Sequence, residues 1–179
     1  AQVRPEAAMA EGSGAVWTMQ VNGNYPDGSP FITAMFTYAG GVGARATKPG
    51  RNACSYPTGV SAVPIEVVEA SAPIRFREKS LRPGSGGAGA QTGGLGQAIE
   101  FSVDTDRAWQ LNAVTSRLSD APLGLFGGEP GATGSFRVNG EAEVLGQFYD
   151  ALAGAVAIEF RPPEALGAKR DVLQHGHVV

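Results

Sequence analysis

The sequence predicts a mainly β fold (α+β): a glycine-rich-loop β-sandwich or a barrel-like domain with one short interior helix. Two observations support this prediction. Segments in which apolar and polar residues alternate recur along the chain, as in strands with one buried face. The 26 glycines and 12 prolines of the 179 residues fall between these segments and mark turns. We expect an N-terminal arm over 1–13, a β-rich domain over 14–162 and a C-terminal tail over 163–179.

The first two expected strands form a hairpin. Residues 15–21 alternate strictly, and residues 31–38 alternate after the segment NGNYPDGSP, whose Asn-Gly and Asp-Gly pairs favour a turn. Burial of each large apolar side chain contributes about 1.5–3 kcal/mol, which is sufficient to fix the register of the hairpin. The expected buried faces carry Ala15, Trp17, Met19 and Val21 on the first strand and Ile32, Ala34, Phe36 and Tyr38 on the second.

A short helix is expected next. Pro64 suits its first turn, and Pro73 ends it. Upstream, Thr58 and Ser61 are expected to cap this helix, and the alternative is that they shape a ligand wall. The residues that line one side of the helix are Ile65, Val68 and Ala72.

Later strands are expected over 74–81, 98–104, 108–118 and 156–162, with a short hairpin over 135–141. Basic residues alternate along the first of these strands, so they share one face. This face is either solvated, as at the charged edge of a sheet, or a positive surface for a carboxylate, a phosphate or an acidic partner subunit. The residues are Arg75, Arg77 and Lys79.

The loop over 81–97, LRPGSGGAGAQTGGLGQ, holds seven glycines between two expected strands. Glycine permits a positive φ and a close approach of another backbone. The spacing is similar to GxGxxG, but nucleotide sites need a helix that begins directly after the glycines, and here a strand pattern follows without any lysine in the loop. We therefore expect a structural crossing, in which Gly87→Val or Gly94→Val impairs folding or assembly before it alters chemistry.

Charge and composition exclude several classes of protein. The net charge of −3 and pI of about 5.4 argue against nucleic acid as the main partner. Apolar runs fall short of the roughly 18 residues that a membrane crossing needs. Cys54 is the only cysteine, so no internal disulfide forms, and the N-terminus lacks a signal-peptide pattern. A cytoplasmic location is expected.

A complete catalytic set is not apparent. Cys54 and Ser55 lie in a loop suited to a nucleophile, but the only histidines are His175 and His177, close to the C-terminus. His-x-His can bind a metal, although a bystander role at a frayed chain end is the simpler interpretation. We therefore assign no catalytic residue and no metal ligand, and we do not expect the chain to be a complete enzyme.

Four separated motifs occur in an order that resembles the C-terminal portion of the hydantoinase B family. They are GGVGAR over 40–45, PTGVSAVPIEVVEA over 57–70, the loop over 81–97 and GLFGGEPGATG over 124–134. The resemblance covers nearly the whole chain, including the terminal DVLQHGHVV. The family includes the B subunit of N-methylhydantoinase, the corresponding half of ATP-dependent 5-oxoprolinase and the alpha subunit of acetone carboxylase.

The resemblance implies a cytoplasmic hetero-oligomer. A hydantoinase A-like subunit supplies the nucleotide site, and ATP activates an amide or carbonyl oxygen of a small-molecule substrate. The N-terminal part of a hydantoinase B-like subunit is the second expected partner, and neither nucleic acid nor membrane is one. ATP and a divalent metal are expected elsewhere in the complex and not on this chain alone. Hydantoins, lactams, oxoproline and ketones remain open as substrates.

The residues assigned to structure or to a possible active-site wall lie mainly in the glycine-rich motifs, and the resemblance adds Pro64 and residues 124–128 to them. The assigned residues are Gly40, Gly41, Gly43, Arg45, Ser55, Thr58, Glu66, Arg82, Ser85, Gly86, Gly87, Gly93, Gly94 and Gly96.

Two segments depart from the family pattern. Residues 90–92 are Ala-Gln-Thr where family members often carry basic and aromatic residues, which removes charges that could hold an anion or a partner. PEALGAKRD over 163–171 stands where a GGGGYG-like turn is expected. Terminal packing or an interface is therefore expected to differ.

Three functions follow as hypotheses. The first is a subunit or fragment of an ATP-dependent hydantoinase, oxoprolinase or ketone carboxylase complex that supplies structure and a substrate- or subunit-facing wall. The alternative is a noncatalytic assembly or scaffold module of such a complex. An isolated β-sandwich binding module is the third.

Overall fold

The computed structural model describes residues 4–14, 16–138, 141–142, 156–160 and 175–178. These residues form a 3-10 helix, one α-helix and nine strands, so the predicted mainly β fold with one short α-helix is confirmed. The elements are η1 (Pro5–Ala7), β1 (Trp17–Asn24), β2 (Pro30–Tyr38), α1 (Ile65–Ser71), β3 (Ile74–Leu81), β4 (Gln97–Val103), β5 (Trp109–Val114), β6 (Phe136–Val138), β7 (Glu141–Ala142), β8 (Val156–Phe160) and β9 (His175–Val178).

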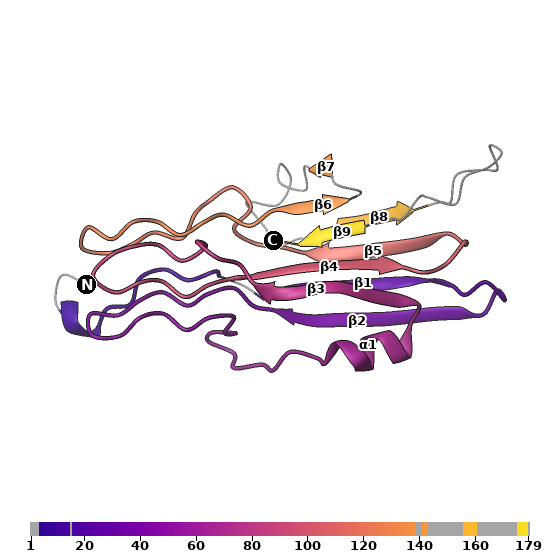
Figure 1. Cartoon of the computed structure of the whole chain (residues 1–179), viewed down its shortest axis with the longest axis horizontal. Helices are drawn as coiled ribbons and strands as arrows, with labels where there is room; N and C mark the ends of the chain where they lie inside the picture. The colour runs from indigo at the N-terminus through magenta and orange to yellow at the C-terminus, as the bar shows by residue number, and fades with distance from the viewer. Residues whose placement is uncertain (1–3, 15, 139–140, 143–155, 161–174, 179) are drawn as a thin grey trace.

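The strands form two antiparallel sheets (Figure 1). One sheet has the order β2-β1-β5-β8 and the other the order β3-β4-β9-β6-β7. Buried side chains from both sheets and from α1 belong to one hydrophobic cluster, so the sheets share a core. The described strands do not close into a barrel, which removes the barrel-like alternative. The largest fully buried side chains are Phe101, Met19, Met35, Leu111 and Val21.

The predicted hairpin of β1 and β2 is confirmed. The two strands pair antiparallel, with Val21 opposite Thr33. The side chains of Trp17, Met19 and Val21 are buried as expected, whereas Ala15 lies outside the described residues. The alternation of β1 was therefore sufficient to predict its buried face.

The predicted buried face of β2 is wrong. Ile32 is 67% exposed and Ala34 only half-buried. Near the end of the hairpin the register shifts, and one additional residue on β2 forms a β-bulge. The bulge lets Tyr38 join the core although it lies three positions after Met35, and the side chain of Phe36 is outside the described part. The buried side chains of β2 are Phe31, Thr33, Met35 and Tyr38.

β3 and β4 pair antiparallel on either side of the glycine loop, as predicted. A register shift between Phe76 and Glu78 places Arg75 opposite Ser102 but Lys79 opposite Ile99. Residues directly opposite each other share a face, and Ser102 and Ile99 lie on different faces of β4. The predicted single basic face is therefore wrong, because the bulge divides it. The residues concerned are Arg75, Arg77 and Lys79.

The helix α1 covers the core with Val68, and Ala72, which follows it, is also buried. The predicted apolar side is therefore confirmed, but the predicted cap is wrong. Pro64 occupies the N-cap position, and no side-chain hydrogen bond caps the helix. Thr58 and Ser61 precede this position, so they do not provide the missing acceptor.

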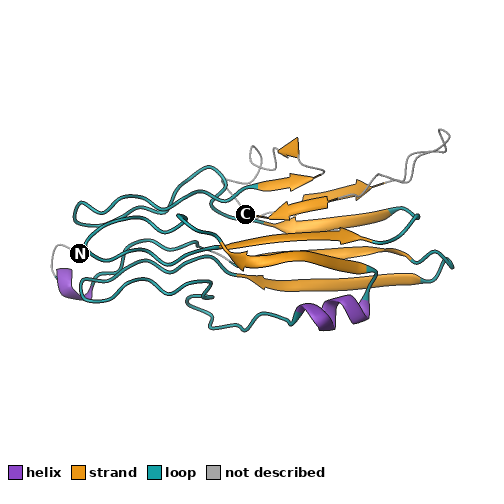
Figure 2. Cartoon of the chain, viewed as in Figure 1, coloured by secondary structure: helices purple, strands orange, loops and turns teal. Residues whose placement is uncertain are grey.

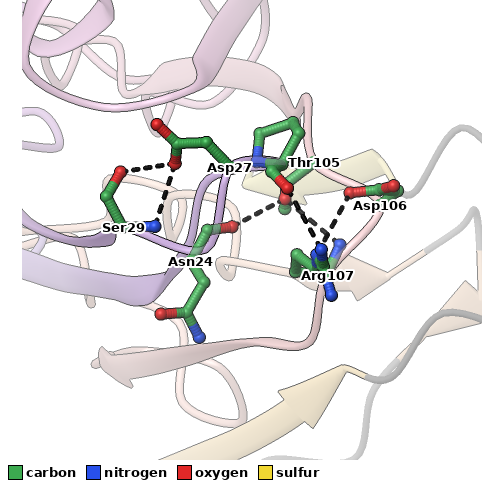
Figure 3. A network of polar contacts seen from close by, with 7 residues as sticks. Asn24, Asp27, Ser29, Thr105, Asp106 and Arg107 are labelled. Carbon is green, nitrogen blue, oxygen red and sulfur yellow. Dashed lines mark hydrogen bonds and ion pairs between the residues drawn. The ribbon is translucent and has the colours of Figure 1, made fainter.

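The turn between β1 and β2 contacts the turn between β4 and β5 (Figure 3). The hydroxyl of Thr105 donates to the carbonyl oxygen of Asn24 at 2.7 Å, and Nη2 of Arg107 donates to that of Pro26 at 3.1 Å. These contacts join the β1–β2 turn to the β4–β5 turn. The predicted turn over 22–30 is thereby held by residues about 80 positions later in the chain.

The carboxylate of Asp27 accepts two hydrogen bonds from Ser29, from the hydroxyl at 2.6 Å and from the backbone N–H at 2.9 Å (Figure 3). The hydroxyl bond is the main reason that the pKa of Asp27 lies below its ordinary value. A lowered folded pKa contributes stability above the unfolded pKa, and this contribution is lost as the pH falls through the folded pKa.

We expect Ser29→Ala to raise the pKa of Asp27 toward its ordinary value, because the hydroxyl donor is removed while the backbone donor remains. NMR titration of the Asp27 carboxyl carbon in both proteins measures this change. Ser80→Ala is a matched control that removes an exposed hydroxyl from β3, away from this turn. An Asp27 titration that is identical in all three proteins would show that the hydroxyl bond is not formed in solution.

Strand β9, near the C-terminus, lies between β4 and β6. His175 is opposite Ser102, and His177 is opposite both Glu100 and Arg137 in the register. The two histidines therefore belong to a paired strand and not to a frayed end. Their side chains are outside the described part of the structure.

Candidate binding site at the glycine-rich loops

Three long loops and the N-terminal segment run out together from one end of the two sheets (Figure 2). They surround a pocket of about 410 Å³. The lining comes from residues 8–13, 38–46, 82–99, 116–117 and 122–134, together with Trp17. The sequence motifs that are widely separated along the chain thus meet at one site.

Backbone hydrogen bonds join the loops to one another. The carbonyl oxygen of Val42 accepts from the backbone N–H of Gly94 at 3.0 Å, and the N–H of Val42 donates to the carbonyl oxygen of Arg51 at 3.0 Å. The third loop is attached through the N–H of Glu129, which donates to the carbonyl oxygen of Ala88 at 2.8 Å. The loops therefore form a layer with satisfied backbone groups although they contain no strands.

The N-terminal segment is part of this layer. The N–H of Ala10 donates to the carbonyl oxygen of Ala44 at 2.8 Å, and the N–H of Ser13 donates to that of Gly41 at 2.9 Å. Residues 8–13 thus close one side of the pocket. Their sequence lacks periodicity, so nothing local indicated this role.

Close approach explains most glycines of the three loops. A Cβ on Gly41 would lie 1.8 Å from the carbonyl oxygen of Gly94, and one on Gly43 would lie 1.8 Å from that of Ala10. In the loop over 81–97, only Gly84 has a φ in the left-handed region, at +74°. The glycines are therefore required mainly for space, and the positive φ expected from the sequence applies to a single position.

Arg82 and Ser85 form the corner at which the loop leaves β3. The backbone N–H of Arg82 donates to the carbonyl oxygen of Gly96 at 2.9 Å, and its Nη1 donates to that of Thr133 at 2.8 Å. The hydroxyl of Ser85 donates to the carbonyl oxygen of Arg82 and accepts from the N–H of Gly96, both at 2.8 Å. These bonds fix both the backbone and the guanidinium of Arg82.

An ion pair also contributes to the lining. Nη2 of Arg117 is 3.1 Å from Oε2 of Glu11, and the same oxygen accepts from the backbone N–H of Leu123 at 3.1 Å. Arg117 has a φ of 60°, which is uncommon for a residue other than glycine. Sequence reasoning missed both charged residues, because they are separated by more than 100 positions and neither belongs to a glycine motif.

The floor of the pocket is formed where the loops join the sheets. Tyr38 is 8% exposed, and burial raises the pKa of its hydroxyl well above the ordinary value. Nε1 of Trp17 donates to the carbonyl oxygen of Ser116 at 3.0 Å, and Nε2 of Gln97 donates to that of Ala39 at 2.8 Å. The side chains at the floor are thus held in place by backbone acceptors.

Most residues assigned from the sequence lie in this pocket, and three do not. Ser55 is buried outside the lining, Thr58 is exposed in the segment before α1, and Glu66 is exposed on α1. The residues that line the pocket are Gly40, Gly41, Gly43, Arg45, Arg82, Ser85, Gly86, Gly87, Gly93, Gly94 and Gly96.

The side chains and backbone groups of the lining determine what the pocket can bind. The glycine loop over 81–97 continues directly into β4, so no helix N-terminus is available there for a phosphate. Among the described residues, no three His, Cys, Asp or Glu side chains gather as a metal site would require. The polar groups of the lining are the guanidiniums of three arginines, the carboxylates of Glu11 and Glu129, hydroxyls, amides and backbone groups.

A family model described as Hydantoinase B/oxoprolinase matches residues 1–169. The chain belongs to the hydantoinase B/oxoprolinase family. The resemblance that the four motifs indicated is thereby confirmed. Among the helices in the described ranges, none has the length and apolar character needed to cross a membrane.

Similar proteins are considerably longer than this chain. An uncharacterized protein from Schizosaccharomyces pombe is 38% identical over 99 residues, which are 55% of this chain and 8% of that protein. An uncharacterized protein from Methanocaldococcus jannaschii is 40% identical over 75 residues, which are 42% of this chain and 13% of that protein.

The nucleotide-free structure of acetone carboxylase, an enzyme of ATP-dependent acetone carboxylation, has a similar fold. It matches with a TM-score of 0.66 and 16% identity, over 99% of this chain and 26% of the acetone carboxylase chain. At this identity the likeness concerns the fold alone. This chain thus spans about a quarter of the acetone carboxylase chain.

Proposed function

We propose that the chain is a subunit or fragment of a multi-subunit ATP-dependent enzyme of the hydantoinase, oxoprolinase or ketone carboxylase type. It contributes structural surface and a wall that faces the substrate or a partner subunit. A hydantoinase A-like subunit and the N-terminal part of a hydantoinase B-like subunit complete this cytoplasmic complex. ATP and a divalent metal bind in those parts and not on this chain alone.

The observation that carries this proposal is the meeting of the glycine motifs around one pocket. Backbone hydrogen bonds join three parts of the chain, the segment over 40–51 and the loops over 82–96 and 122–134. Residues from all three line the pocket. Such backbone packing is rigid, which suits a wall that positions a substrate. Membership of the hydantoinase B/oxoprolinase family supports the assignment to this class of enzyme.

Purification of the tagged chain from its source under native conditions tests the proposal. We expect native mass spectrometry to detect larger chains with hydantoinase A-like and B-like sequences. We also expect deletion of the chain to abolish ATP-dependent turnover of one among hydantoin, 5-oxoproline and acetone. Recovery of the chain without such partners, together with unchanged activity after deletion, would overturn the proposal.

A noncatalytic assembly module is the second candidate. Leu123 is 60% exposed and Phe126 is 69% exposed on the third loop, where both line the pocket. Apolar side chains displayed on a rigid loop are suited to contact with another subunit. In the assembled complex, Arg82→Gln distinguishes the candidates: reduced turnover with normal assembly favours the wall, and normal turnover favours the scaffold.

A further inference from the structure

Among the described residues, no carboxylate forms an ion pair with Arg82. Its side chain is half-buried in the pocket, and its one side-chain hydrogen bond goes to the carbonyl oxygen of Thr133. A guanidinium has five N–H donors, so most of its donors are available to another molecule. Partly buried cations are normally paired, so an anion is expected here.

The positive charges of the pocket lining outnumber the negative charges. Three arginines and two glutamates contribute to the lining. Arg117 is neutralised by Glu11 at 3.1 Å, whereas Arg45 and Glu129 are exposed. The pocket therefore has a positive excess in a chain whose formal net charge is −3.

Tyr38 supplies a second available donor. Its hydroxyl has no hydrogen-bond partner among the described residues, and no fully buried polar side-chain atom there lacks a partner. The hydroxyl therefore keeps some accessible surface, although Tyr38 as a whole is only 8% exposed and packs against the core. A tyrosine hydroxyl is protonated at neutral pH, and the burial that raises its pKa keeps it so, which leaves it able to donate to an anion.

The two donors belong to a continuous part of the lining. Tyr38 precedes Ala39, whose carbonyl oxygen accepts from Gln97 at 2.8 Å. Gly96, the neighbour of Gln97, accepts from the backbone N–H of Arg82 at 2.9 Å. Apolar atoms of Trp17 and Ile99 line the same pocket.

Size and charge indicate the class of ligand. A volume of about 410 Å³ is within the range of small-molecule sites. One unpaired guanidinium matches a single negative charge, and its fork is complementary to a carboxylate. A phosphate is better matched by several converging cations or a helix N-terminus. The glycine loop continues into a strand, and of the other two arginines in the lining, Arg117 is paired with Glu11 and Arg45 is exposed.

We propose that the pocket binds the carboxylate group of a small organic acid, with the Arg82 guanidinium as its anchor and the Tyr38 hydroxyl as a second donor. This binding is a property of the chain itself and does not depend on the proposed ATP-dependent complex. Arg82 is rigidly held before the ligand arrives, which lowers the entropic cost of binding.

Calorimetry and ¹H–¹⁵N NMR of the full chain test this proposal with three pairs of probes: cyclopentanecarboxylate, benzoate and acetate, each with its neutral carboxamide. We expect at least one carboxylate to bind with a Kd in the millimolar range or below and to shift the amide signals of Gly86, Gly96 and Thr133. Its carboxamide should bind about tenfold more weakly or not at all. Inorganic phosphate should bind more weakly than that carboxylate.

Variants at the two donors identify the anchor. Arg82→Gln should weaken carboxylate binding about tenfold or more, and Arg82→Lys should weaken it less because the charge remains. Tyr38→Phe preserves the ring and should weaken binding several-fold. Arg77→Gln removes an exposed charge outside the pocket and is the matched control, with unchanged binding expected.

Several results would overturn the proposal. They are equal affinity for a carboxylate and its carboxamide, no binding of any probe up to about 20 mM, tighter binding of phosphate, and full binding by Arg82→Gln. If Arg82→Gln fails to fold, as judged by circular dichroism, Arg82→Lys, Tyr38→Phe and the probe pairs on the unaltered chain still decide the question.

Discussion

Gly94→Ala is expected to destabilise the chain by about 3 kcal/mol or more, which would lower the midpoint of thermal unfolding by roughly 10 °C. The new Cβ would lie 2.0 Å from the carbonyl oxygen and 2.5 Å from the carbonyl carbon of Arg51. Both atoms belong to the backbone, so no side-chain rotation relieves the clash. The loops would have to separate, with loss of the bond from the Gly94 N–H to Val42.

Gly96→Ala is the matched control for this prediction. Gly96 lies in the same loop and also lines the pocket, but a Cβ there would be 3.7 Å from the nearest atom, Oγ of Ser85. We expect a change within about 1 kcal/mol, because the contact is ordinary and alanine restricts the unfolded chain. Thermal unfolding of both variants followed by circular dichroism measures the difference. Equal stability of the two variants would show that the loops do not pack as closely as described.

The same argument applies to Gly87, whose Cβ would lie 2.2 Å from the carbonyl oxygen of Glu129. Gly87→Val should therefore separate the loop over 81–97 from the loop over 122–134. We expect it to impair folding or assembly before it alters any catalytic activity. A soluble and fully assembled Gly87→Val or Gly94→Val variant that had lost only turnover would contradict this view of the loops.

Phe101→Ala is the second change with a large expected effect, a loss of about 3–5 kcal/mol in the free energy of unfolding. The ring is 1% exposed and lies on β4, between β3 and β9. Its centroid is 6.0 Å from that of Phe76. Removal of the ring leaves a cavity between the sheets that the rigid strands cannot fill.

Phe126→Ala is the control of the same residue type, because its ring is 69% exposed. We expect it to change stability by less than about 1 kcal/mol. Trp17 and Trp109 are both buried, so their fluorescence during urea unfolding reports directly on the core. A loss of only about 1 kcal/mol for Phe101→Ala would show that the two sheets do not share the described core.

Local sequence patterns predicted those elements whose side chains alternate without interruption. The buried face of β1, the apolar side of α1 and the hairpin of β6 and β7 were all correct. The β-bulges in β2 and β3 were not predicted, because one additional residue leaves no mark in the polarity of a strand. The bulge of β3 precedes Lys79 and reverses its face, and the bulge of β2 places Ile32 and Tyr38, which strict alternation would put together, on opposite faces.

The candidate site was predicted only in part, because some of its contacts join residues far apart in the chain. The glycine motifs identified Arg82, Ser85 and most of the pocket wall, because dense glycine marks places where backbones meet. Glu11 and Arg117 lie in segments without a motif, and their pairing depends on contacts that span more than 100 positions.

The sequence by itself determined family membership, the mainly β composition and the places where loops must contain glycine. These properties follow from local alternation, from turn residues and from motifs that can be read one at a time. Only the tertiary structure decided which loops meet and that most glycines serve close approach and not positive φ. It also decided that Arg117 pairs with Glu11, whereas Arg82 donates to a backbone carbonyl oxygen and forms no ion pair among the described residues. Those outcomes depend on distances between segments far apart in the chain, which alternation and spacing along one segment do not encode.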